Sequence, residues 1–197
     1  MLFSDQLKCD KKPTSLGCAS NSLSSDFEEL YNNGQFSDVT LKLDDEEFKA
    51  HKLVLSARSK VFAAMFEHDM KENRQDTVNL VQMKVETVRD MLRYVYCGKI
   101  RDLSPAEALN LYVAADHYDL QELRAICRDV IVLDISIENV CDIVEVADLH
   151  DDESLIKELK SFLSKNGKKI IKTEKWKDIC KNNPVLCGKM FEWAFDE

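Results

Sequence analysis

Glycine and proline are scarce in this sequence, which has five glycines and three prolines among its 197 residues. Because turn-rich β-sandwich domains rely on both residues, their scarcity indicates a chain built mainly from helices. Long apolar runs are also missing, since no stretch approaches the roughly 20 apolar residues that a membrane-spanning helix requires. The first residues, MLFSDQLKCDKK, lack the long apolar core of a secretory signal peptide. We therefore expect neither a membrane span nor a signal peptide.

The sequence also lacks the short motifs that mark common enzymes. It contains no glycine-rich phosphate loop, no HExxH pair and no GxSxG elbow. His150 precedes Asp151 and Asp152, and this trio suggests a metal site, but an acidic helix start explains it better. A cysteine–histidine enzyme stays open, because such partners lie far apart in sequence. We expect a non-catalytic protein that needs no cofactor and no metal.

Positive charge is too sparse for a typical nucleic-acid-binding protein. The formal net charge is −9 at pH 7, and an acidic surface repels phosphate backbones. The one basic stretch, KNGKKIIK at 165–172, is interpreted as a helix end with solvated lysines. Nucleic acids are therefore not expected among the partners.

The cysteines show no pairing pattern. The chain has seven, at positions 9, 18, 97, 127, 141, 180 and 187, without a CxxC motif. We interpret them as reduced residues that mostly pack in the core, and we expect no intramolecular disulfide. Reduced thiols are typical of the cytoplasm and the nucleus, so we expect one or both of these compartments.

The first half of the chain mixes strand and helix patterns. Residues 1–22 show no periodicity and are interpreted as a flexible leader. A short amphipathic helix follows from Leu23, and Gly34 ends it. Helices are also predicted between the second and third strands and over 85–97, where Gly98 follows. Alternating apolar residues predict strands at 39–43, 47–50 and 77–81.

From residue 104 onward, the sequence predicts helices only. The stretch SPAE at 104–107 places Ser at the N-cap, Pro at the first helical position and Glu at the third. One predicted helix ends near Gly167. The other predicted helix starts are Asp119, Ser136, Asp151 or Asp152, Thr173 and Asn183-Pro184. The layout is that of an α+β domain followed by an all-α extension.

Three stretches together carry a family resemblance. FSDVTLKLDDEEFKAHKLVLSARSKVFAAMFEHDMKEN, then MLRYVYCGKI and LYVAADHYDLQEL, resemble a BTB/POZ domain, and most closely that of speckle-type POZ proteins, the MATH-BTB adaptors. Beyond them, ISIENVCDIVEVADLHDDESLIKELKSFL and TEKWKDIC resemble the BACK-like region of the same proteins. We therefore assign 1–22 to the leader, 23–131 to the BTB/POZ domain and 132–197 to the BACK-like region. Since 22 residues are too few for a MATH domain, this domain is expected to be absent, either in a shorter relative or in a trimmed chain.

The resemblance implies an adaptor for ubiquitin ligases built on cullin-3. In the family pattern, an apolar-x-Glu triplet after the third helix contacts the cullin, and here that triplet is Met70-Lys71-Glu72. An unbranched Met suits an interface because it adapts to its pocket. The alternative for Met70 is that it continues the apolar stripe from Phe66 and finishes the helix.

The resemblance also implies a homodimer through the first helix. In relatives this helix packs on its symmetry mate, and the matching residues here are Leu23, Phe27 and Leu30, with Val54 beneath. Packing of the same residues within one chain is the alternative.

Three further residues match charged or aromatic positions of the family. Asp38 and Lys52 match a charged pair at the base of many BTB dimers. A buried structural ion pair and a ligand site are equally good interpretations of this pair. Phe191 matches an aromatic at a second oligomer contact, made by the BACK-like region, and a core role is its alternative. The alternative function is an oligomerisation module that binds no cullin, for instance by pairing with a MATH-bearing relative.

Overall fold

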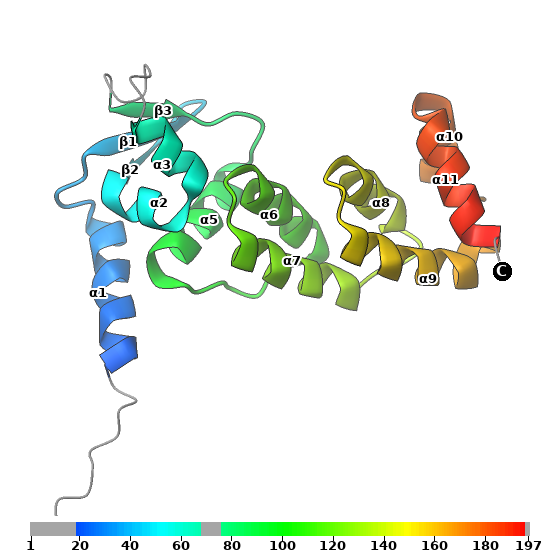
Figure 1. Ribbon diagram of the computed structural model, residues 1–197, viewed down its shortest axis with the longest axis horizontal. Helices are drawn as coiled ribbons and strands as arrows, with labels where there is room; N and C mark the ends of the chain where they lie inside the picture. Colours follow the sequence, from blue (N-terminus) through cyan, green and yellow to red (C-terminus); the bar gives the residue numbers. More distant parts are fainter. Residues whose placement is uncertain (1–18, 68–75, 196–197) are drawn as a thin grey trace, which may run out of the picture.

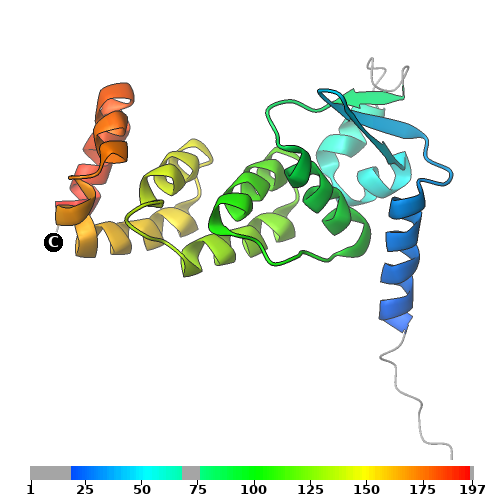
Figure 2. The same cartoon turned by 180° about the vertical axis from the view of Figure 1, so that it is seen from behind.

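The structure of the protein is a computed structural model that describes residues 19–67 and 76–195. Helix α1 (Ala19–Asn33) lies at one end of an elongated molecule, and α11 (Pro184–Phe195) lies at the other (Figures 1 and 2). A small sheet with helices around it forms the first half, and helices alone follow it. The predicted α+β fold is therefore confirmed.

The sheet contains three strands in the order β2-β1-β3. Strands β1 (Val39–Leu43) and β2 (Glu46–Ala50) form an antiparallel hairpin in which Leu41 faces Phe48, and β3 (Thr77–Asn79) runs parallel to β1. Every second residue of β1 is buried, as the alternating pattern predicted. Asp44 in the hairpin turn has a φ of 51°, a left-handed conformation that Asp tolerates better than most residues.

Helices lie beside this sheet, and α1 and α5 end where the sequence predicted. Helices α2 (Lys52–Arg58) and α3 (Lys60–Glu67) follow the hairpin, and α5 (Val85–Cys97) provides much of the core. Gly98, with a φ of 66°, ends α5, and Gly34, with a φ of 60°, follows α1. A position with a left-handed backbone conformation after a helix favours glycine, because glycine has no Cβ.

After the sheet and α5, consecutive helices joined by short turns follow: α6 and α7 complete the first half, and α8 to α11 form the second half. Figure 1 shows α6 beside α7, then α8 with α9, and α10 with α11 at the far end. Their bounds are α6 (Pro105–His117), α7 (Gln121–Leu133), α8 (Val140–Leu149), α9 (Glu153–Ile170), α10 (Glu174–Asn182) and α11 (Pro184–Phe195).

Four of the predicted helix starts are confirmed. Ser104 and Glu107 form a complete capping box at α6, in which each side chain bonds the other residue's backbone N–H. The Asp152 carboxylate accepts the Leu155 N–H at α9, so it caps that helix as the acidic-start interpretation requires. Thr173 caps α10 in the same way, and Asn183 accepts the Leu186 N–H at α11.

Three local predictions are wrong, each because a different contact decides the structure at that position. Asp119 does not cap α7: Leu120 occupies that position, and its side chain is only 3% exposed. Ser136 does not cap α8, because the Asn139 side chain binds the Ser136 N–H in a turn that delays the helix to Val140. Gly167 does not end α9, which continues to Ile170. A Cβ on Gly167 would lie 2.9 Å from the Cβ of Ala194. The absence of a side chain at Gly167 therefore allows α11 to pack closely against α9.

Candidate functional site

A largely apolar groove of about 550 Å³ opens between α1, α2 and the end of α5. Leu53 and Leu23 are its most exposed apolar residues, with 80% and 59% of their surface accessible. Phe27 and Val54 are half-buried, since each also packs against the core. The groove is lined by Leu23, Ser24, Phe27, Leu53, Val54, Ala57, Arg58, Val95, Tyr96, Cys97 and Gly98.

Three of the four predicted dimer residues, Leu23, Phe27 and Val54, line this groove. The fourth, Leu30, lies on α1 but is not part of the lining. Leu23, Phe27 and Leu30 recur at helical spacing on one face of α1. Leu30 is half-buried and packs against the core, whereas Leu23 extends beyond it. Leu53 was missed by the sequence reasoning. Its signal was the run Leu53-Val54-Leu55 at the start of a seven-residue helix, too short to bury all three.

Polar contacts fix α1 against α5, so the groove has a defined shape. The Ser24 hydroxyl donates to the Cys97 carbonyl over 2.9 Å. Glu28 lies 3.0 Å from the Arg93 guanidinium and 2.8 Å from the Lys99 ammonium. Hydrogen bonds and charge from Lys99 and Arg93 lower the pKa of the Glu28 carboxyl, so it is ionised at neutral pH.

Behind the groove, His51 is a packed and hydrogen-bonded residue. Its ring is 8% exposed, with Nε2 2.7 Å from the Gln35 carbonyl and Nδ1 2.8 Å from the Tyr96 hydroxyl. Because a carbonyl only accepts, Nε2 carries the proton there. Burial raises the pKa of Tyr96 to about 12, so its hydroxyl stays protonated.

Asp38 and Lys52 lie side by side where β2 meets α2. The Asp38 carboxylate accepts the backbone N–H of Lys52 over 2.7 Å. The Lys52 ammonium reaches the Asp76 carboxylate over 2.5 Å and lies 5.7 Å from the centre of the Phe66 ring. Whether these residues belong to the base of a dimer stays a prediction.

Met70 and Glu72 lie outside the described residues. The described ends of their segment are Glu67, the last residue of α3, and Asp76, which precedes β3. Asp76 pairs with Lys52 at the start of α2. The cullin-contact assignment of Met70 and Glu72 stays a prediction.

A partly buried polar cluster joins α6 and α7, the last helices of the first half, to α8 and α9, the first helices of the second half. We call it the polar joint: Tyr112, Asp116, Arg124, Arg128, His150 and Asp152. The Asp152 carboxylate accepts the Tyr112 hydroxyl over 2.7 Å and lies 3.3 Å from the Arg124 guanidinium. Burial raises the pKa of Asp152, but the Tyr112 and Leu155 hydrogen bonds and the two arginine charges outweigh it and lower the pKa overall. Asp152 therefore stays charged at neutral pH.

Asp116 makes two further contacts of the polar joint. Its carboxylate lies 3.0 Å from the Arg124 guanidinium and 2.6 Å from His150 Nδ1. His150 is thus held by an acidic residue of α6. In the described part of the chain, no three His, Cys, Asp or Glu side chains gather into a group able to bind a metal ion.

Helix α11 carries a pair of exposed aromatic residues. Phe191 and Phe195 are 55% and 42% exposed, and their ring centres lie 4.7 Å apart. The buried residues of α11 are Leu186, Met190 and Ala194. The Phe191 side chain is therefore not part of the core of the described chain, and its role in an oligomer contact stays a prediction.

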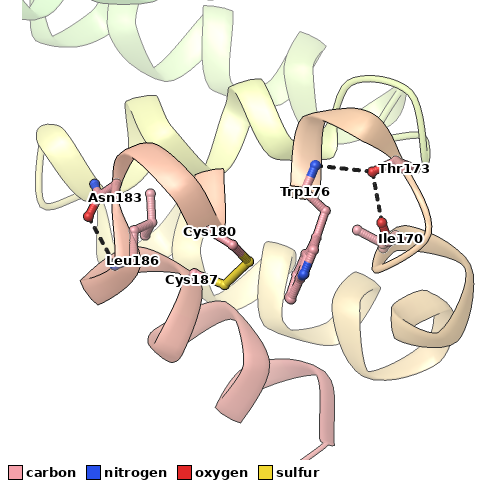
Figure 3. The surroundings of a disulfide bond; sticks show 7 residues. All are labelled: Ile170, Thr173, Trp176, Cys180, Asn183, Leu186 and Cys187. Carbon is pink, nitrogen blue, oxygen red and sulfur yellow. Dashed lines mark hydrogen bonds between the residues drawn. A yellow bond between two sulfur atoms is a disulfide. The ribbon is translucent and has the colours of Figure 1, made fainter. Parts of the chain in front are cut away.

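The expectation that every cysteine is reduced is wrong. Cys180 and Cys187 form a disulfide between the end of α10 and the first turn of α11 (Figure 3). The pairing depends on the sharp turn at Asn183-Pro184, which brings the two Cα atoms within 4.9 Å. Cys97, Cys127 and Cys141 are free thiols. Burial raises the pKa of Cys127 to about 12 and of Cys141 to about 11, so both stay protonated and unreactive.

Across residues 19–67 and 76–195, no helix combines the length and the apolar character that a bilayer crossing requires.

Comparison with known proteins identifies the family. The BTB/POZ domain model matches residues 27–135. The mouse TD and POZ domain-containing protein 1 is 34% identical over 171 residues, and protein 4 of the same name is 35% identical over 170. Each alignment covers 86% of this chain but only 47% and 46% of the relative. The chain thus spans about half the length of these curated relatives.

A solved structure supports the same fold. The BTB domain of zebrafish PATZ1 superposes with a TM-score of 0.52 at 24% identity, covering 63% of this chain and all of that domain. The assignments to speckle-type proteins and to a BACK-like region stay predictions. Since the family match covers more than half of the sequence, this chain belongs to the BTB/POZ family, whose domains are protein-interaction modules that commonly dimerise.

Proposed function

We propose that this chain is the dimeric adaptor subunit of a cullin-3 ubiquitin ligase, acting in the cytoplasm, the nucleus or both. The observation that carries the proposal is the apolar groove between α1, α2 and α5, where Leu53 and Leu23 are more than half exposed. Exposed apolar surface of this kind is typical of interaction sites. The adaptor itself performs no chemistry; it holds partners in place.

The proposed dimer places the same groove of two copies against each other. In such an isologous interface the leucines of one copy cover the groove of the other, so each contact occurs twice. The polar contacts of Ser24 and Glu28 hold α1 in position beforehand, which reduces the entropy lost on association.

The dimer is tested by adding charge to the two most exposed groove residues. The double variant Leu23→Glu and Leu53→Glu leaves the core intact, but in a dimer it buries unpaired charges, which costs several kcal/mol. Sedimentation velocity at micromolar concentration should then report a monomer. The control is Leu133→Glu, because Leu133 lies at the end of α7 and is 87% exposed. If the double variant remains dimeric with an unchanged melting temperature, the groove is not the interface.

Cullin binding is tested at the Met70 triplet. As an interface anchor, Met70→Ala should lose about 2 kcal/mol, which is roughly 30-fold in affinity. Glu72→Ala should lose about 1 kcal/mol, as expected for one partly hydrated hydrogen bond. Lys71→Ala is the matched control, since Lys71 lies between the two contacts. Titration calorimetry against the cullin-3 N-terminal region gives the affinities, and thermal melts give the folding.

Two results of this titration would contradict the assignment. Wild-type affinity in Met70→Ala would remove Met70 from the interface. A loss of binding that parallels a fallen melting temperature would instead make Met70 a residue that finishes the helix.

A second contact is proposed at α11, where Phe191 is exposed beside Phe195. Helix α1, which helps to line the groove, and helix α11 lie at opposite ends of the molecule (Figures 1 and 2). Two isologous contacts at separate ends would link dimers into larger assemblies. Phe191→Ser should reduce such assemblies to dimers in sedimentation velocity, whereas Val185→Ser on the same helix, 75% exposed, is the control.

The second candidate function is an oligomerisation module that binds no cullin, for example by pairing with a MATH-bearing relative. The groove supports this function equally well, because dimerisation needs nothing from the segment around Met70. This function predicts that the Leu23 and Leu53 variants abolish pairing. It also predicts that neither the wild type nor any variant releases heat when titrated with the cullin.

A further inference from the structure

The disulfide lies beneath the exposed aromatic stripe of α11. Cys187, Phe191 and Phe195 are spaced four residues apart, so they share one face of the helix. The Cys180–Cys187 bond attaches the start of that face to α10 (Figure 3). Whatever changes this bond acts directly on the element that carries Phe191.

The turn between α10 and α11 has its own noncovalent contacts, so the bond is not needed to form it. The Asn183 N–H donates to the Ile179 carbonyl over 2.7 Å, and the Cys187 N–H donates to the Asn183 carbonyl over 3.0 Å. The Asn183 side chain accepts the Leu186 N–H over 3.1 Å (Figure 3). Reduction should therefore loosen the first turn of α11 without unfolding the two helices.

Both sulfur-bearing residues are only partly buried, unlike Cys127 and Cys141 in the core. A thiolate from solution can attack a disulfide only where a sulfur is accessible. The buried thiols, with their raised pKa values, do not compete for exchange. In the compartments proposed above, disulfides are usually transient and serve redox sensing.

We propose that Cys180 and Cys187 form a reversible redox site that controls the mobility of the first turn of α11. The oxidised pair fixes that turn to α10 and holds the aromatic stripe in place, and the reduced pair releases it. Its effect on self-association rests on the proposed contact at Phe191, with a second copy of this chain as the partner.

The oxidant is a small disulfide of the glutathione type. One cysteine thiolate attacks a sulfur of glutathione disulfide, whose S–S bond breaks and releases one glutathione thiolate. The second cysteine thiolate then attacks the protein sulfur of the mixed disulfide and releases the second glutathione. The two cysteines lose two electrons and two protons in all, and the two glutathione molecules take them up.

The experiment equilibrates the full chain in glutathione buffers of stepped oxidation. Acid quenching, alkylation and mass spectrometry give the oxidised fraction of the pair, and hydrogen exchange gives the protection of the Leu186 and Cys187 amides. We expect a complete transition within these buffers, with protection lost on the order of tenfold or more in the reduced form. The double variant Cys180→Ser and Cys187→Ser should match the reduced protein in every buffer. A control with serine at Cys9 and Cys18 should behave like the wild type.

The outcomes separate this inference from the proposed function. A pair that stays oxidised, or stays reduced, in every buffer overturns the redox site, and so does a transition that leaves α11 protection unchanged. Loss of protection with self-association weakened by about fivefold or more supports the site together with its effect on assembly. Loss of protection with unchanged sedimentation supports the redox site and overturns the contact at Phe191.

Discussion

The two halves of this chain are held together by different means. In the first half, alternate residues of β1 and one face of α5 pack around a small sheet, and apolar residues remain for the groove. In the second half no sheet organises the described helices, and their order depends on caps, a glycine contact and a disulfide. The comparison teaches that buried apolar residues form one core through both halves, which the first half arranges around a sheet and the second half arranges between helices alone. We expect the polar joint to decide whether the halves unfold together.

The largest expected effect comes from breaking the polar joint. Asp152→Ala removes the cap of α9 and leaves the two arginines without their shared carboxylate. Removing one partner of a buried charged group costs about 3–5 kcal/mol. Urea unfolding should then show two separate transitions where the wild type shows one. The control Glu153→Ala alters an exposed residue of the same turn and should change stability little. A single, unshifted transition in Asp152→Ala would mean that the joint does not couple the halves.

Acid should remove part of the same stabilisation. The folded pKa of Asp152 lies below its ordinary value. The stabilisation by its charge is therefore fully present above the unfolded pKa, which is about 3.9. It is lost as pH falls through the folded pKa, because protonation ends the arginine pairing. The difference in unfolding free energy between wild type and Asp152→Asn should therefore be smaller at pH 3 than at pH 7. An unchanged difference would show that the charge of Asp152 is not what stabilises the joint.

A smaller effect is expected where α9 and α11 approach most closely. Gly167→Ala places a Cβ 2.9 Å from that of Ala194, and overpacking of this kind costs about 1–3 kcal/mol. The control is Gly188→Ala on α11, where a Cβ would meet nothing within 4 Å. That variant should gain up to about 1 kcal/mol in helix propensity. Thermal melts compare the two, and equal melting temperatures would show that α11 moves aside at little cost.

The smallest expected effect lies at the start of α6. Ser104→Ala removes one side of the capping box and should cost about 1 kcal/mol. Since α6 contributes Tyr112 and Asp116 to the polar joint, the loss should appear in the unfolding of both halves. Chemical denaturation followed by circular dichroism measures it, with Ser161→Ala on the exposed face of α9 as the control. A loss confined to one half would indicate that α6 does not transmit stability across the joint.

Prediction from sequence succeeded where a few neighbouring residues decide the structure. The alternation in β1, the glycines after α1 and α5, and the Ser104 capping box each depend on contacts within one or two turns. It failed at Asp119, because burial of Leu120 against the core outweighed the local capping preference. Caps compete with tertiary packing, and packing of an apolar side chain contributes more free energy.

The candidate site likewise contains residues that were predicted and one, Leu53, that only the tertiary structure exposes. The resemblance to BTB/POZ domains assigned Leu23, Phe27, Leu30 and Val54 to the dimer contact, and the first three share one face of α1 by their helical spacing. Leu53 was missed because sequence does not show which residue of a short apolar helix stays uncovered. The fold exposes it where α2 faces the groove.

The sequence by itself determined the family, the α+β order of elements, most helix ends and the apolar face of α1, because these follow from periodicity and from backbone preferences of nearby residues. Only the tertiary structure decided that Asp152 joins the halves, that Gly167 admits α11 and that Cys180 meets Cys187. Each of these depends on how helices cross or how a turn reverses the chain. Such distances arise from packing the whole chain, and no local pattern encodes them.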